Sequence, residues 1–265
     1  MDGRSLQARL RGWIAFRFGR RSLSRLPPAV LVALGLCVVP FAALAADPRE
    51  VALGRELADG SLLDPDHTCS RCHGLRGAGR PQKDAPRLAG QPRLYLQKQL
   101  EDFAAGRRKS DKMQPVARSL TPAWREAAAA YYASLHAVPY PPPPEADPVI
   151  VQQGGILSAV GDEERDIRAC EICHADAGVG LAPSFPYLAG QYADYTARQL
   201  RLWKRGERRN DPLEVMAEIA RRLSEQEIDA LGLYFARVRP PSETVSSPIP
   251  GEPIPSPPED PAVPD

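Results

Sequence analysis

The sequence is poor in the residues that usually build metal and redox sites. Its 265 residues include five cysteines, four histidines and three methionines, one of which is the initiator. Cys37 lies in an N-terminal segment that we expect to be removed, and the other four cysteines form two C-x-x-C pairs. No cysteine is then left to join distant parts of the mature chain through a disulfide bond. Convincing strand alternation is also missing, so the pattern favours a helical fold.

The N-terminus has the organisation of an export signal. Residues 1–28 carry seven arginines and one aspartate, and a short apolar run ending in small residues follows them. A basic region, an apolar region and a small-residue cleavage site predict a signal peptide over 1–45, cut between Ala45 and Ala46. The alternative is an uncleaved membrane anchor, for which the apolar run is marginal in length. We therefore expect a periplasmic protein, with a membrane-anchored form as the alternative.

A basic surface of the kind that binds nucleic acid is missing as well. The whole chain has a formal net charge of +1, and the predicted signal peptide accounts for the excess of arginine. The segment 240–265 contains ten prolines, five acidic residues and no lysine or arginine. We predict that this tail is disordered. The remaining globular part is close to neutral, which excludes nucleic acid as a partner.

The mature chain repeats itself. The sequence CSRCH at 69–73 returns as CEICH at 170–174, and PRLAGQPRLYLQKQL at 86–100 returns as PYLAGQYADYTARQL at 186–200. This pattern predicts tandem duplication of one small domain. We place the two copies at 46–138 and 148–239, joined by a stiff proline-rich linker at 139–147.

Local signals inside each copy are helical. In the first copy the apolar residues of 96–103 follow helical spacing, and Gly106 stands where a helix would end. The last helix of that copy is predicted to begin at Thr121, with Pro122 at its first position. Its counterpart begins with Ser224 and Glu227, which fit a capping box. Two small helical domains of this size need an apolar centre that their own side chains do not supply.

Each C-x-x-C pair is followed directly by a histidine. In the pattern C-x-x-C-H the two thiols add to the vinyl groups of a porphyrin, and the histidine becomes an axial ligand of iron. A four-cysteine zinc site is the alternative, but its two cysteine pairs would be about 15–20 residues apart, and here they are in separate repeats. The sequence therefore predicts two covalently attached haem c groups. The predicted attachment residues are Cys69, Cys72, Cys170 and Cys173, and the predicted iron ligands are His73 and His174.

The second axial ligand decides whether such an iron is open or closed. Met113 and Met216 occupy matched positions in the two copies, in what we predict to be a loop before the last helix. Ligation by a second histidine is the alternative, but only the first copy has spare ones, His67 and His136. We therefore predict Met113 and Met216 as the second ligands. A six-coordinate haem suits electron transfer and not substrate activation.

These motifs together resemble class I di-haem cytochromes c of the cytochrome c4 type. The resemblance covers residues 47–238 and rests on C-x-x-C-H, on P-x-L-A-G-Q at 86–91 and 186–191, and on G-x-R before each methionine. It implies an all-α fold of two tandem class I cytochrome c domains, each wrapped around a covalently attached haem. It also implies that the carbonyls of Pro86 and Pro186 accept hydrogen bonds from Nδ1 of the two histidine ligands. Ala175 departs from the pattern, because Gly74 holds that position in the first copy.

The function implied by the resemblance is a di-haem periplasmic electron carrier and not an enzyme. It would pass electrons between respiratory or dehydrogenase donors and a terminal acceptor such as an oxidase. The expected partners are membrane-bound redox complexes (an oxidase or a quinol-oxidising complex) or dehydrogenases, bound transiently. One alternative is a cytochrome subunit of a dehydrogenase complex. Another is a di-haem peroxidase-like or thiosulfate-oxidising enzyme, which the matched methionines and the lack of a spare cysteine disfavour.

Overall fold

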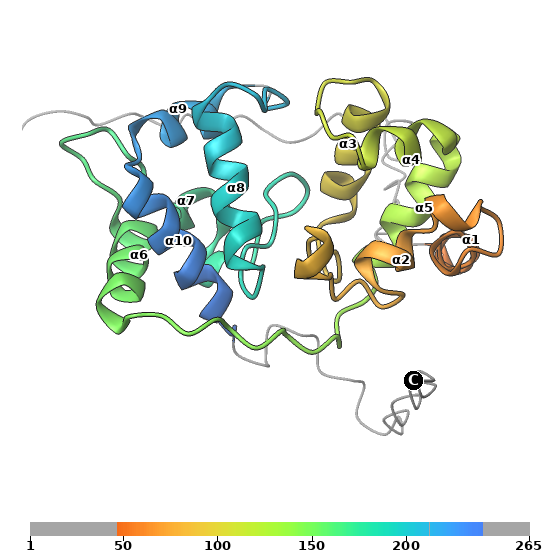
Figure 1. Cartoon of the computed structure of the whole chain (residues 1–265), viewed down its shortest axis with the longest axis horizontal. Helices are drawn as coiled ribbons and strands as arrows, with labels where there is room; N and C mark the ends of the chain where they lie inside the picture. The colour runs from red at the N-terminus through yellow and green to blue at the C-terminus, as the bar shows by residue number, and fades with distance from the viewer. Residues whose placement is uncertain (1–46, 212, 241–265) are drawn as a thin grey trace, which may run out of the picture. The chain divides into compact units, whose positions relative to one another are not determined.

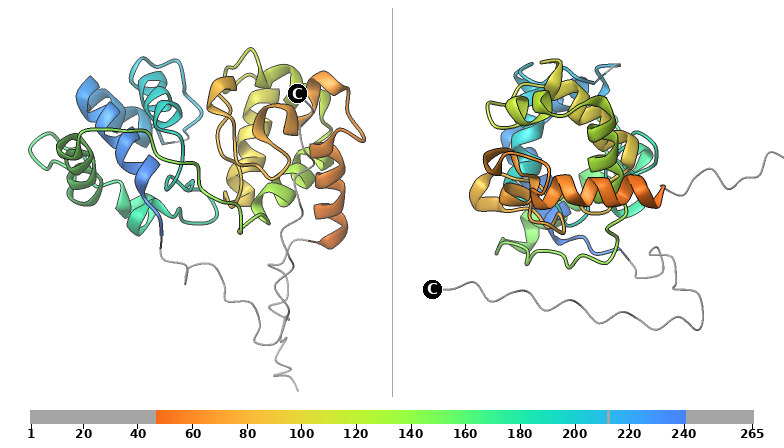
Figure 2. Two further views of the ribbon diagram at one scale, coloured as in Figure 1. Left: turned by 60° about the horizontal axis from the view of Figure 1, so that its bottom comes forward. Right: turned by 90° about the vertical axis from the view of Figure 1, so that its right-hand side faces the viewer.

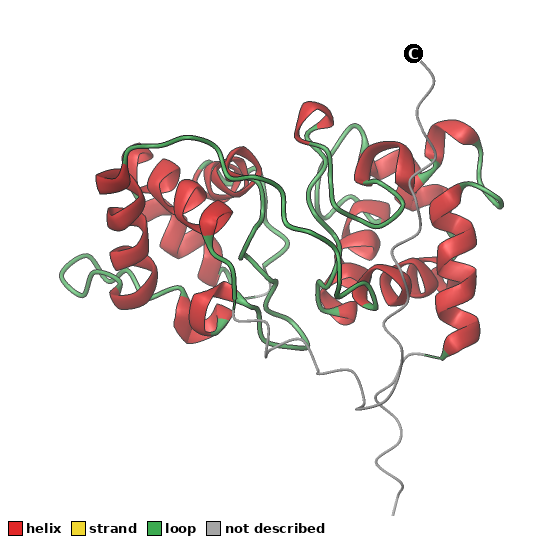
Figure 3. Cartoon of the chain, turned by 90° about the horizontal axis from the view of Figure 1, so that it is seen from below, coloured by secondary structure: helices red, strands yellow, loops and turns green. Residues whose placement is uncertain are grey.

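The computed structural model describes residues 47–211 and 213–240, so the predicted signal peptide and residues 241–265 of the predicted tail lie outside the described residues. Within these ranges the chain is helical. It has no named strand there, only three isolated β-bridges such as the one between Arg80 and Ala85. Figure 3 shows the helices and the long loops that join them. The predicted all-α class is confirmed.

The two repeats form matching sets of helices (Figure 1). The first copy contains α1 (Pro48–Asp59), η2 (Pro65–His67), α2 (Cys69–His73), η3 (Pro81–Lys83), α3 (Arg93–Ala104), α4 (Met113–Ser119) and α5 (Pro122–Ala133). The second contains α6 (Pro148–Val160), α7 (Glu171–His174), η4 (Asp176–Gly178), α8 (Ala193–Lys204), α9 (Val215–Arg222) and α10 (Glu225–Arg237).

The helix ends lie where the local sequence predicts them. Gly106 has φ 75° and follows the end of α3, with its N–H donating to the Phe103 carbonyl at 3.1 Å. The Thr121 hydroxyl accepts from the Trp124 N–H at 3.2 Å at the start of α5. At the start of α10, Ser224 and Glu227 form the complete capping box. These bonds satisfy N–H groups that a helix leaves without internal partners.

The first and last helices of each copy pack closely, α1 against α5 and α6 against α10 (Figures 1 and 2). Gly54 and Gly154 occupy matched positions at these crossings. A Cβ atom at Gly54 would lie 2.0 Å from the Ala127 carbonyl oxygen, and one at Gly154 would lie 2.2 Å from that of Ala230. Only glycine lets the two backbones approach this closely, and both copies have glycine at this helix crossing.

The buried apolar side chains of each copy come from the same helices. In the second copy Leu200 of α8 packs with Ile228, Leu231 and Phe235 of α10, and Met216 packs against this cluster. No helix within the described residues is both long and apolar enough to cross a bilayer.

The segment predicted as a linker is held against the folded protein. Arg87, which is buried, donates to the carbonyls of Val138 at 2.8 Å and Pro139 at 2.9 Å. Its guanidinium also lies over the ring of Tyr140, 4.7 Å from the centroid. The Tyr140 hydroxyl in turn lies 2.5 Å from that of Tyr187 in the second copy. The proline-rich segment therefore contacts both copies.

Candidate functional site

The first C-x-x-C-H motif forms the short helix α2. Cys69 and Cys72 lie three residues apart on this helix, and both are partly buried. Residues spaced in this way share one face of a helix, so both sulfur atoms can reach one flat group. Burial raises the pKa of the Cys69 thiol to about 11. His73 follows in the last position of α2 and is buried.

The second motif repeats this geometry in α7 and the residue before it. Cys170 and Cys173 are partly buried, and burial raises the pKa of Cys170 to about 11 as well. His174 ends the helix and is buried to the same degree as His73. None of these four cysteines is bridged within the described residues. The two copies therefore present the same set of groups.

Each histidine is oriented by a proline carbonyl. The distance from Nδ1 to the carbonyl oxygen is 2.9 Å both for His73 with Pro86 and for His174 with Pro186. This confirms the hydrogen bonds that the resemblance implies. A proton fixed on Nδ1 leaves Nε2 with a lone pair for a metal. Burial lowers the pKa of both imidazoles, which favours the neutral form that ligates metals.

The backbone after the second histidine is strained. Gly74 follows His73 with φ 73° and ψ 148°, whereas Ala175 follows His174 with φ 60° and ψ 169°. That region of backbone conformation is populated almost only by glycine. The departure noted in the sequence thus places an alanine where the fold requires a glycine-like conformation.

The two methionines lie in helices, which corrects the prediction of a loop. Met113 is the first residue of α4, and its N–H donates to the Ser110 hydroxyl at 3.1 Å. Met216 is the second residue of α9, and its N–H donates to the Asp211 carboxylate. Each bond satisfies a first-turn N–H group that the helix leaves without an internal partner. Each thioether therefore projects from a defined helix start and not from an irregular segment.

The histidines considered as alternative ligands lie elsewhere in the first copy. His136 is exposed and follows the end of α5, and His67 is partly buried at the end of η2. No group of three or more His, Cys, Asp or Glu side chains suited to a metal ion occurs in the described part of the chain.

Two arginines are buried where the copies contact each other. The sequence alone did not predict this contact. Arg108 donates to Gln199 of the second copy at 2.8 Å, and Arg208 donates to Gln99 of the first at 3.1 Å. Their neighbours Arg107 and Arg209 are exposed. Burial, and next the charge of Arg108, lower the pKa of Arg208 to about 10. These two arginines are therefore buried between the copies and are not part of a solvated basic surface.

The site chemistry fits covalent haem. A haem c brings two vinyl-derived carbons for thioether bonds, an iron for axial ligands, and two carboxylates. The paired thiols and the oriented imidazole match the first two requirements. The buried guanidiniums of Arg108 and Arg208, which hydrogen-bond mainly to neutral amide oxygens, would favour carboxylates nearby. The indole N–H of Trp203 is buried without a hydrogen-bond partner, as expected of a donor whose acceptor belongs to another group.

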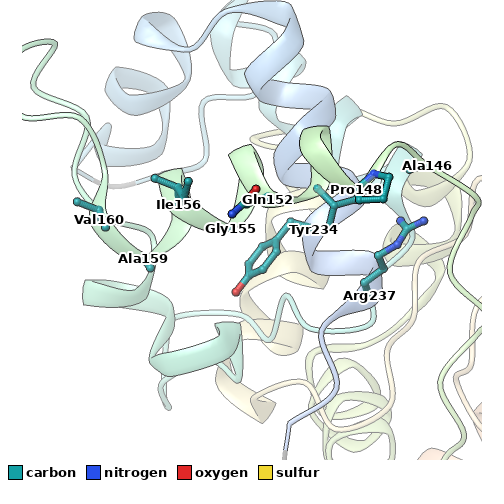
Figure 4. Close-up of a pocket in the computed structure, with 10 residues that line it drawn as sticks. Ala146, Pro148, Gln152, Gly155, Ile156, Ala159, Val160, Tyr234 and Arg237 are labelled. Atoms are coloured by element: carbon teal, nitrogen blue, oxygen red, sulfur yellow. The ribbon is translucent and has the colours of Figure 1, made fainter.

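An apolar groove lies between α6 and the end of α10. Figure 4 shows Ile156 and Val160 from α6, with Tyr234 and Arg237 from α10. None of the predicted haem residues lines it.

Comparisons with known proteins agree with this site. The cytochrome c family model matches residues 54–135. The thiosulfate dehydrogenase electron acceptor of Stutzerimonas stutzeri is 41% identical over 64% of this chain and 78% of its own. Cytochrome c4 from Pseudomonas stutzeri is 34% identical, with a TM-score of 0.63, and the match covers 74% of this chain and 100% of that chain.

A larger protein also shares this fold. Thiosulfate dehydrogenase from Marichromatium purpuratum is 37% identical with a TM-score of 0.65. The match covers 76% of this chain but spans only 44% of that protein. With the repeated helical fold and two matched cysteine–histidine sites, these findings establish that the chain belongs to the di-haem cytochromes c of the cytochrome c4 type and carries covalently bound haem c.

Proposed function

We propose that this cytochrome is a periplasmic electron carrier that accepts single electrons from a dehydrogenase and passes them to a terminal acceptor such as an oxidase. The observation that carries the proposal is the duplicated site, in which each copy supplies two thiols, one oriented imidazole and one methionine. The name of the Stutzerimonas stutzeri relative supports a thiosulfate dehydrogenase as the donor.

The site residues have distinct proposed roles. Cys69 and Cys72 hold the first haem through thioether bonds, and Cys170 and Cys173 hold the second. The carbonyls of Pro86 and Pro186 fix the imidazole rings, so that Nε2 of His73 and His174 would be free to bind the iron. Met113 and Met216 complete the two ligand sets. The bound haem supplies reversible one-electron exchange at iron, and the protein sets its potential and keeps water away.

The alternatives differ in what the methionines do. A peroxidase-like or thiosulfate-oxidising enzyme needs an iron with an open or displaceable position. Two methionines at matched helix starts favour two closed sites and thus a carrier. A permanent cytochrome subunit of a dehydrogenase complex shares the same chemistry and differs only in the lifetime of its complex.

The proposal is tested by anaerobic reduction of the oxidised holoprotein. Catalytic amounts of a thiosulfate dehydrogenase and excess thiosulfate should reduce both haems, which absorbance in the visible bands follows. Joining two thiosulfate ions through one S–S bond releases two electrons, one for each haem. Thiosulfate without the dehydrogenase should leave the protein oxidised. Reduction by thiosulfate alone would instead support the enzyme alternative, and failure with the dehydrogenase would exclude this donor.

A further inference from the structure

The two haem-attachment segments carry charges of opposite sign. Residues 69–86 contain four basic side chains and one acidic side chain, whereas the matched residues 170–186 contain two acidic side chains and no basic one. The basic set is Arg71, Arg76, Arg80 and Lys83. The acidic residues of the second segment are Glu171 and Asp176.

Contacts join part of the basic set into one surface. Lys83 donates to the backbone carbonyl of Arg71 at 2.9 Å, and Lys112 donates to the backbone carbonyl of Lys83 at 3.1 Å. Arg71 lies between Cys69 and Cys72, and Lys112 directly precedes Met113. The chain of contacts therefore runs from the thiols to the start of the methionine helix. We call Arg71, Arg80, Lys83 and Lys112 the basic rim.

The basic rim faces solvent. Arg71, Arg80 and Lys83 are exposed, and the side chain of Lys112 is 66% exposed. The acidic residue of this segment, Asp84, already contacts two cations, Lys112 and Arg198, each at 3.3 Å. The hydrogen bond from Lys112, and next the charge of Arg198, lower the pKa of Asp84, which therefore remains ionised. Asp84 carries one negative charge, whereas the four residues of the basic rim carry four positive charges.

The second copy shows that haem attachment does not require this charge. At the position of Arg71 it has Ile172, which is 70% exposed, and at that of Arg80 it has Leu181, which is 51% exposed. Phe185 follows, with its ring 6.0 Å from that of His174. Val215 takes the place of Lys112 before the methionine. The same fold thus holds its second site with an apolar rim, and the basic rim of the first copy needs another explanation.

We propose that the basic rim is the docking surface for an acidic face of a redox partner protein, which exchanges electrons through the first haem site. The proposal rests on the proposed function as an electron carrier. Clustered charge steers an oppositely charged partner and raises its association rate by roughly ten- to a thousandfold at low salt. A rim that reaches from the thiols to the methionine helix would hold that partner beside the haem it must reach.

The test compares two holoprotein variants with the same change in charge. One, the rim variant, replaces three of the four rim residues through Arg71→Gln, Arg80→Gln and Lys83→Gln. The control replaces exposed arginines of α1, α4 and α9 through Arg49→Gln, Arg118→Gln and Arg221→Gln. Stopped-flow absorbance follows oxidation of each reduced protein by hexacyanoferrate(III), a trianion, and by tris(phenanthroline)cobalt(III), a trication. Each encounter moves one electron from the protein to one oxidant ion.

The expected rate changes are opposite for the two oxidants and occur only in the rim variant. At low salt the rim variant should lose about tenfold or more in rate with the anion and gain with the cation, and the control should change less than about twofold. The differences should vanish at roughly 1 M salt, where screening acts within about 3 Å. Conversely, Ile172→Arg with Leu181→Arg should speed the reaction with the anion. Equal losses in the rim variant and the control would overturn the proposal.

The second part of the test measures electron transfer from a protein donor. Reduction by a thiosulfate dehydrogenase should slow about tenfold in the rim variant and not in the control. An unchanged rate in the rim variant would overturn the docking proposal even where the anion rates differ. If the dehydrogenase fails to reduce the unmodified protein, the proposed donor is wrong, and the two oxidant ions still decide whether the rim steers acidic reactants. Mass and visible spectra of each variant establish that both haems are attached.

Discussion

The side-chain amide of Gln191 in the second copy binds both backbone polar groups of Arg87 in the first. Its Oε1 accepts from the Arg87 N–H at 3.0 Å, and its Nε2 donates to the Arg87 carbonyl at 3.0 Å. Gln91 binds Tyr187 in the same way, at 3.0 and 2.7 Å. Both glutamines end the repeated P-x-L-A-G-Q motif and are buried. The proline of each motif therefore orients the histidine of its own copy, and the glutamine binds the backbone of the other copy.

Gln191→Ala should disturb the first haem site from the second copy. Arg87 directly follows Pro86, whose carbonyl orients His73, so loss of the amide frees the backbone at that point. Leaving buried backbone groups without partners costs about 1–3 kcal/mol in unfolding free energy. Denaturant unfolding measures this cost, and a redox titration should show a larger change at the first haem than at the second. Gln153→Ala, at an exposed position of α6, is the control. A shift confined to the second haem would contradict this coupling.

Ala175→Gly should stabilise the second copy. Ala175 holds φ 60° and ψ 169°, a conformation that costs a residue with a Cβ atom of order 1–3 kcal/mol. Glycine removes this cost, so the free energy of unfolding should rise by about 1 kcal/mol. The reverse change, Gly74→Ala, should lower it, because Gly74 has φ 73°. Thermal and denaturant unfolding of the two holoprotein variants provide the comparison. A destabilised Ala175→Gly variant would contradict the strain.

Met113→Ala and Met216→Ala should each open one haem site. Loss of the thioether removes the proposed second ligand, which lowers the reduction potential of that haem and lets carbon monoxide bind its reduced form. Each variant should lose about half of the weak near-infrared band of the methionine–iron bond. The two variants serve as controls for each other, because each leaves the other copy intact. A full-strength band in either variant would show that the methionine in question is not a ligand.

Stability should fall in acid through Asp102, which links the two copies. Burial opposes its ionisation, but hydrogen bonds from Lys98, Asn210 and Arg107 outweigh this and lower its pKa. A depressed pKa in the folded state contributes stability above the unfolded value of about 3.9 and loses it as the pH falls through the folded pKa. Asp102→Asn should therefore be less stable than the unmodified protein near neutral pH and show a flatter decline in acid.

The control for this titration is Asp229→Asn, because the Asp229 side chain is 54% exposed on α10. Exposed substitutions of this kind change stability by about 0.5 kcal/mol or less. Urea unfolding at neutral pH and at pH values between about 5 and 2 separates the two variants. The same acid slope in Asp102→Asn and in the unmodified protein would contradict the assignment.

Local sequence was sufficient for the features that neighbouring residues determine. The C-x-x-C-H motifs and the caps at Thr121 and Ser224 act within a few residues, so their spacing specifies their geometry. The repeat at a fixed offset likewise predicts two copies of one helical domain. The sequence did not predict the helix starts at Met113 and Met216, because neither helix has a capping side chain at its N-cap residue, Lys112 or Glu214.

Tertiary structure alone decided which polar residues join the two copies. Gln91, Gln191 and the buried pair Arg108 and Arg208 contact residues about a hundred positions away, and nothing in their own segments distinguishes them from solvated side chains. The opposite charges of the two attachment segments were present in the sequence, but only the contacts of Lys83 and Lys112 show that the basic residues form one rim. The strength of hydrogen bonds and of charge interactions depends on the distance between the groups. For residues far apart in the sequence, folding alone sets that distance.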